Sequence, residues 1–170
     1  MWEKRCRMVA FHIGDKVIHC TYGLGEIVHI EEKIIGGEPT KCYVLQTPEL
    51  MVWIPIHGHQ GCSLRLPTPP EEFPKVFTML TSPHEGLRED REMRKTQLMA
   101  QMNDGKLLSI CQVVRDLTHF KRGKKLNDQE KYILERAINS LLTEWAYSLE
   151  VTLIQARQAM THMLTMSQPA

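Results

Sequence analysis

Apolar and β-branched residues alternate with polar ones in short runs between residues 13 and 55. The runs cover residues 16–19, 26–35, 41–46 and 51–54. Runs of this length and period, separated by Gly, Pro and Thr, predict antiparallel strands joined by hairpins. Gly23 and Gly25 are expected to turn the chain after the first run, and Gly36-Gly37 supplies the positive φ angles of a tight hairpin. The pattern therefore predicts a small curved β-module of SH3-like or Tudor-like type.

The period of the apolar positions changes after the prolines of residues 67–70, which disfavour both helix and central strand. Spacings of three and four residues then predict helices over residues 73–80, 87–102 and 106–120. Asn127 with Glu130 forms a capping-box pattern that opens the last helix. Its apolar stripe continues to Met160, which would make one helix of roughly 50 Å. We expect that helix either to bend near Ser148 or to project from the domain.

These patterns predict an α+β protein in two parts. The β-module covers residues 11–66, a proline linker covers residues 67–70, and an all-helical domain covers residues 71–165. Residues 1–10 form a short basic extension to which we assign no function.

Composition limits the functions open to the chain. Its 170 residues are 42% hydrophobic and 24% charged, which is ordinary for a soluble globular protein. A net charge of +1 means that any contact with DNA must come from a local patch. Apolar runs are too short to cross a bilayer, and the five cysteines lack C-x-x-C spacing. We expect reduced thiols and a cytoplasmic location.

One cluster of residue types suits a metal ion. His57, His59 and Cys62 could supply imidazole and thiolate ligands, but their spacing matches no standard zinc site, and a polar loop after Pro55 is the simpler explanation. The sequence contains no G-x-x-x-x-G-K-[ST] phosphate loop and no arrangement of nucleophile, base and orienting group. We therefore expect no enzyme activity, no cofactor and no small-molecule substrate.

Two separate motifs resemble one protein family. The first is Gly14-Asp15-Lys16-Val17-Ile18, Gly23-Leu24-Gly25, Gly37-Glu38, Tyr43-Val44-Leu45 and Val52-Trp53-Ile54-Pro55. It resembles the RNA polymerase-interacting domain of the bacterial CarD/CdnL family, which also occurs in transcription-repair coupling factors. The second, residues 112–117 with Asp104-Gly105 before and Glu135-Arg136 after, is similar to the family's helical domain. The resemblance covers about residues 11–149, and the remaining tail has no counterpart.

The resemblance implies a non-enzymatic bacterial transcription regulator. Its β-module would pair with the lobe of the RNA polymerase β subunit, and its helical domain would contact promoter DNA largely independently of sequence. Lys33 and Trp53 match positions that contact polymerase in the family. Alternatively, Lys33 is a solvated charge at a sheet edge and Trp53 is a core residue of one sheet face.

The family places a tryptophan wedge at the start of the helix predicted over residues 87–102, where this chain has Arg91. Arginine can enter a narrow minor groove but cannot wedge like an indole. Basic candidates for phosphate contact fall in two groups, Arg88, Arg91, Arg94 and Lys95 and then Lys121, Arg122, Lys124 and Lys125. Acidic neighbours of the first group allow an ordinary solvated mixed-charge helix instead.

Two other functions compete with a polymerase-binding regulator. One is an SH3-like or Tudor-like protein-interaction module with a helical oligomerisation domain, which would bind without polymerase or DNA. The other is a metal-dependent hydrolase that uses His57, His59 and Cys62, which would contain stoichiometric zinc.

Overall fold

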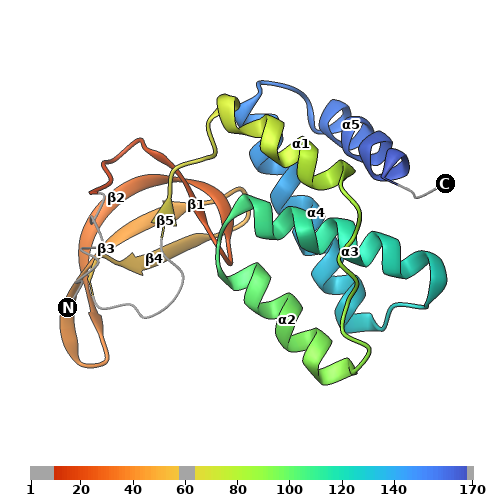
Figure 1. Cartoon of the computed structure of the whole chain (residues 1–170). Helices are drawn as coiled ribbons and strands as arrows, with labels where there is room; N and C mark the ends of the chain where they lie inside the picture. Colours follow the sequence, from red (N-terminus) through yellow and green to blue (C-terminus); the bar gives the residue numbers. More distant parts are fainter. Residues whose placement is uncertain (1–9, 58–63, 168–170) are drawn as a thin grey trace, which may run out of the picture.

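A curved antiparallel sheet forms the N-terminal part of the chain (Figure 1). The computed structural model describes residues 10–57 and 64–167, and within them the sheet has five strands in the order β4-β3-β2-β1-β5. The strands are β1 Lys16–His19, β2 Gly23–Ile35, β3 Glu38–Gln46, β4 Met51–Pro55 and β5 Leu64–Arg65. Because β4 and β5 end the order, they are the two edge strands of the sheet within the described residues.

The sheet curves around a small core of its own. Val17, Ile27, Tyr43 and Leu45 are buried in it, and the register shifts between Ile27 and His29 of β2. Such a bulge bends a strand and increases its twist, which lets the long β2 wrap around the core.

The glycines of the β-module serve two different purposes. Gly36 and Gly37 have φ angles of 62° and 89°, as predicted for the turn between β2 and β3. Gly25 lies inside β2, not in a turn as predicted, and a Cβ there would lie 2.7 Å from Cδ1 of Leu45 and 2.8 Å from the Gln46 carbonyl oxygen. A side chain at Gly25 would therefore push β2 and β3 apart.

Helices make up the rest of the described chain, which contains no strand after Arg65. They are a 3₁₀ turn Pro70–Glu72, α1 Phe73–Thr81, α2 Arg91–Asn103, α3 Leu107–Gly123, α4 Asp128–Ser148 and α5 Leu153–Met166. The predicted combination of a β-module and a helical domain is confirmed. The helices pack around α3, whose Val113, Val114 and Leu117 are fully buried.

The long apolar stripe after Asn127 belongs to two helices. The capping box of Asn127 and Glu130 opens α4 as predicted, but α4 ends at Ser148, and Glu150 has a φ of 52°. Thr152 and Gln155 form a second capping box that opens α5. Ala156, Met160 and Leu164 are buried in the helical core, so α5 folds back on the domain and does not project.

The sheet and the helical domain are held together by a buried carboxylate. Arg65 of β5 donates from Nη1 and Nη2 to the two carboxylate oxygens of Glu144 on α4, at 2.7 and 2.8 Å. Thr68 donates to Glu144 Oε1 from its backbone N at 2.8 Å and from Oγ1 at 2.7 Å. Arg65 Nε donates to the carbonyl of Gly105 at 2.6 Å. We call Arg65, Thr68, Gly105 and Glu144 the joint.

Two expectations from composition concern the thiols and the membrane. Cys42 and Cys111 are buried free cysteines, whereas Cys20 is disulfide-bonded, so the prediction of thiols throughout is wrong for Cys20. Of the helices in the described ranges, none combines the length and the apolar character that crossing a bilayer requires.

Candidate functional site

The structure brings the two predicted polymerase-contact residues together on one face of the sheet. Lys33 of β2 and Trp53 of β4 lie on either side of β3, and the Lys33 Nζ is 3.7 Å from the centroid of the Trp53 ring. Trp53 Nε1 also donates a hydrogen bond to Glu31 Oε1. A cation over an indole face is held by the ring quadrupole. We call Glu31, Lys33 and Trp53 the tryptophan patch.

The tryptophan patch covers a buried layer of the same sheet face. Cys42 of β3 lies opposite Glu31 in the register and is completely buried. Burial raises the pKa of the Cys42 thiol, Lys33 lowers it in part, and Glu31 raises it. Trp53 itself is half-buried and Lys33 is exposed. Trp53 therefore packs on the buried residues of this sheet face and still leaves part of its ring accessible. Its position lies between the two alternatives from the sequence, a buried core residue and an exposed contact residue.

Next to the tryptophan patch runs the open edge of β4. Ile56 N donates to the Lys41 carbonyl and Thr47 N donates to the Leu50 carbonyl. In an antiparallel ladder such bonds alternate along a strand, so the backbone groups of Met51 and Trp53 point away from β3. Pro55 has no N–H, so it cannot donate a backbone hydrogen bond to a strand added at this end of the edge. The outward-pointing backbone groups of β4, which is an edge strand within the described residues, therefore lie beside the tryptophan patch.

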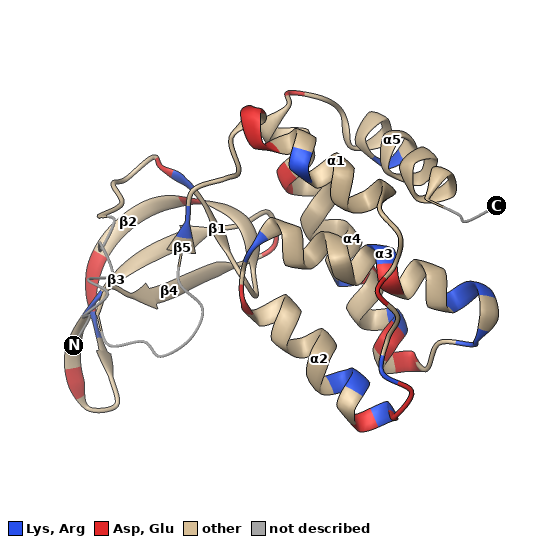
Figure 2. Cartoon of the chain, viewed as in Figure 1, with Lys and Arg blue, Asp and Glu red and all other residues tan. Residues whose placement is uncertain are grey.

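The predicted basic residues gather at the end of the helical domain that lies away from the sheet (Figures 1 and 2). Arg91 is the first residue of α2, which begins four residues later than predicted because Asp90 caps it by accepting from Met93 N at 2.8 Å. Arg91, Lys124 and Lys125 line one hollow of about 630 Å³. The predicted residues that are exposed here are Arg88, Arg91, Lys95, Lys121, Arg122, Lys124 and Lys125.

Arg94 lines the same hollow, but unlike the other predicted cations it is buried and paired. It is only 7% exposed, and its Nε donates to Glu130 Oε1 at 2.7 Å. Its Nη1 donates to the carbonyls of Arg88 and Glu89 at 2.8 and 2.9 Å. The guanidinium therefore ties the segment before α2 to α4, and these bonds compete with any contact to a phosphate.

The candidate metal ligands lie mostly outside the described residues. His57 lies just after β4, and His59 and Cys62 fall outside the described residues. Among the residues that are described, no group of three or more His, Cys, Asp or Glu side chains could hold a metal ion.

Two family models match the chain, one for each part. A model described as CarD-like/TRCF RID domain matches residues 11–60. A model described as CarD, C-terminal domain matches residues 75–161, which is half of the chain. The chain belongs to the CarD family.

A curated relative supports membership of the CarD family. The Bacillus subtilis (strain 168) protein with the name "Putative transcription factor YdeB" is 26% identical over 136 residues, which are 79% of this chain and 89% of that protein. Both matched CarD-family domains are of the transcription-factor type and not enzyme domains, which supports a role in transcription regulation. The C-terminal match also extends beyond residue 149 into α5, so the prediction that the tail has no counterpart is wrong for most of that helix.

Sequence reasoning missed several members of these surfaces. Glu31 could have been found, because it is two residues from Lys33 and residues at this spacing share a sheet face. Lys131 also lines the hollow beside Arg91, where its hydrogen bond lowers the pKa of Asp128. Arg157 of α5 lines a neighbouring pocket together with Lys121, Arg122, Lys124 and Lys125. The sequence around Arg157 does not indicate that it lies beside these lysines, because its place depends on how α5 folds back onto α4.

Proposed function

We propose that this CarD-family protein is a non-enzymatic bacterial transcription regulator that binds the lobe of the RNA polymerase β subunit and contacts promoter DNA. One observation carries the proposal. The tryptophan patch with the β4 edge lies in the sheet, and the exposed basic residues lie at the opposite end of the helical domain (Figure 2). Two binding surfaces at opposite ends of one chain suit a protein that bridges two partners.

The β4 edge is suited to strand addition. A partner strand that pairs with an open edge gains backbone hydrogen bonds, and side chains at alternate positions supply specificity. Met51 is 47% exposed and shares the sheet face of Trp53 by register. The partner strand would therefore meet the outward backbone groups of β4, an indole and an accessible apolar side chain together.

The basic end is suited to phosphates and not to base recognition. Its cations come from the segment before α2, from α2, from the last turn of α3 and from the turn between α3 and α4. Long cationic side chains bind the DNA backbone in a way that does not depend on sequence. Arg91 occupies the start of α2 without the wedge of an indole, so charge supplies most of this contact.

The polymerase contact is tested by a double substitution in the tryptophan patch. Lys33→Glu with Trp53→Ala removes a cation and the largest accessible ring beside β4, and we expect binding to the isolated β-subunit lobe to weaken by about 30-fold or more. The measurement is isothermal titration of the full chain against the lobe. Lys41→Glu is the matched control, because Lys41 is exposed on the other face of the same hairpin.

Either of two outcomes would contradict the polymerase contact. The double variant would bind as tightly as the parent chain, or Lys41→Glu would weaken binding as much as the double variant does. Circular dichroism of each variant is the control measurement that checks whether the helical domain remains folded.

The DNA contact is tested by its salt dependence. Each phosphate contact contributes about −0.9 to the slope of log affinity against log salt concentration, so replacing Lys124 and Lys125 with alanine should flatten that slope by about 1.8. The measurement is fluorescence anisotropy of a labelled promoter duplex at several salt concentrations. Lys75→Ala with Lys106→Ala is the control, since these lysines are exposed but lie outside the basic end. A slope equal to that of the parent chain would show that Lys124 and Lys125 do not contact DNA phosphates.

A further inference from the structure

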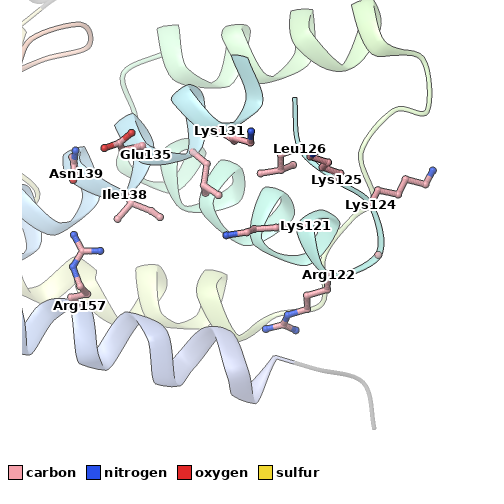
Figure 3. A pocket seen from close by; sticks show the side chains of 12 residues that line it. Lys121, Arg122, Lys124, Lys125, Leu126, Lys131, Glu135, Ile138, Asn139 and Arg157 are labelled. Carbon is pink, nitrogen blue, oxygen red and sulfur yellow. The ribbon is translucent and has the colours of Figure 1, made fainter. Parts of the chain in front are cut away.

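A pocket of about 690 Å³ opens between the α3–α4 turn, α4 and α5 (Figure 3). Its volume is within the range of small-molecule sites, roughly 300 to 1,000 Å³. Cations line it at Lys121, Arg122, Lys124, Lys125, Lys131 and Arg157. Among its lining residues in the described chain, Glu135 is the one carboxylate. We call this cavity the basic pocket.

The positive charge of the basic pocket is largely unneutralised. Lys121, Lys125 and Arg157 form no ion pair with any described residue, whereas Lys131 pairs with Asp128 at 2.9 Å. Arg122 donates from Nη2 to the Leu164 carbonyl at 3.2 Å, which orients it without cancelling its charge. Like charges held around one cavity repel each other, and an anion placed among them relieves that repulsion.

The floor of the basic pocket is apolar. Leu126 and Leu134 are buried, and Ile138 is half-buried between the cations and the polar rim. A free phosphate would use the cations and leave this floor in contact with water. A DNA backbone would follow the outer lysines and also leave the floor empty. The combination of cations and an apolar floor favours an anion that carries a flat apolar body.

The two ends of the basic pocket differ in chemistry. Lys124 and Lys125 lie at one end, Asn139, Glu135 and Arg157 lie at the other, and Lys121 lies between them (Figure 3). An Asn amide both donates and accepts hydrogen bonds, and a carboxylate accepts them, which suits the polar edge of a nucleobase. The planar guanidinium of Arg157 can stack on an aromatic ring. One end therefore fits phosphates and the other fits a base.

We propose that the basic pocket binds a free nucleoside polyphosphate. The phosphates lie among Lys121 and the lysines of the α3–α4 turn, the base lies over Ile138, and its edge meets Asn139. Because Lys124 and Lys125 are also the proposed phosphate contacts of promoter DNA, the bound nucleotide competes with DNA. That competition rests on the proposed function, whereas nucleotide binding does not.

Isothermal titration of the full chain with ATP, GTP and inorganic tripolyphosphate tests the pocket without DNA. At least one nucleoside triphosphate should bind about tenfold or more tightly than tripolyphosphate, because the base adds apolar contact and hydrogen bonds. Arg157→Ala should remove about tenfold of nucleotide affinity. Gln158→Ala is the matched control, since Gln158 is the next residue on α5, is exposed and does not line the pocket.

The outcomes separate the pocket from the DNA surface. Lys95→Ala, a change at an exposed α2 residue outside the basic pocket, should leave nucleotide affinity unchanged. Equal affinity for tripolyphosphate and both nucleotides, or no loss with Arg157→Ala, would overturn the proposal. Nucleotide binding that fails to displace promoter DNA would overturn the shared use of Lys124 and Lys125 and leave the pocket in place.

Discussion

Replacement of Arg94 by alanine is expected to lower the free energy of unfolding by about 4 kcal/mol, the cost of breaking a buried ion pair by removing one partner. The side chains of Arg94 and Glu130 are 9% and 5% exposed. Without the guanidinium, the Glu130 carboxylate stays buried with no counter-charge, and the carbonyls of Arg88 and Glu89 lose a donor. The segment that leads into α2 should then detach from α4.

Urea unfolding followed by circular dichroism measures this loss. Lys95→Ala is the control at the next position of α2, where the side chain is exposed, and it should change stability by less than about 0.5 kcal/mol. The two possible roles of Arg94 give different results. An Arg94→Ala chain as stable as the parent but weaker in DNA affinity would show that Arg94 contacts phosphate, as its sequence neighbours suggested.

Glu144→Ala is expected to lower the free energy of unfolding by about 3 kcal/mol. Glu144 accepts hydrogen bonds from both terminal nitrogens of Arg65 and from the backbone and hydroxyl of Thr68. Removing the carboxylate leaves Arg65 Nη2 and the two Thr68 donors without an acceptor among the described residues, while Arg65 Nη1 keeps the Leu66 carbonyl at 3.1 Å. The loss is smaller than for Arg94 because the Arg65 side chain is 26% exposed and regains some water.

Urea unfolding also measures the effect at the joint, with tryptophan fluorescence as a second probe because Trp145 is the neighbour of Glu144. Glu135→Ala is the control, as Glu135 is exposed on the same helix and its loss should cost less than about 0.5 kcal/mol. Glu144→Gln should fall between the parent and Glu144→Ala, because an amide oxygen still accepts from Thr68. If all of these variants were equally stable, the joint would not hold the two parts together.

Local patterns in the sequence predicted the features that local chemistry decides. The alternating runs located β1 and the main parts of β2, β3 and β4. The paired glycines located the hairpin, and Asn127 with Glu130 located the start of α4. In each case the residues that form the feature lie within a few positions of each other, so its free energy depends little on distant parts of the chain.

Features that depend on distant residues were harder to predict. The two-residue strand β5 pairs with β1 while the joint holds Arg65 against α4 and the start of α3. The apolar stripe after Asn127 continues across the break between α4 and α5, so periodicity alone left two alternatives, a bend near Ser148 or a projecting end. The break lies where the bend was expected. The family resemblance located Lys33 and Trp53, but their contact follows from the register of three strands.

The burial of Arg94 could have been predicted from its spacing along α2, but its charge favoured a surface position. It precedes Leu98 and Met102 by four and eight residues, and both are buried on the inner face of α2. That spacing places Arg94 on the same face, where a charged residue requires a partner. Its charge and its position among Arg88, Arg91 and Lys95 suggested a surface role instead. Helical phase was the better guide to its location.

The joint would determine how often a weak DNA contact is occupied once the chain is bound to polymerase. Glu144 fixes the sheet against the helices in the free chain, so a chain bound through the tryptophan patch would hold its basic end at one set distance from the polymerase. The local concentration of that basic end near promoter DNA would then be about millimolar, as for sites joined by a short tether. A DNA contact too weak to detect with the free chain would be occupied at that concentration, and loosening the joint would reduce occupancy without altering either surface.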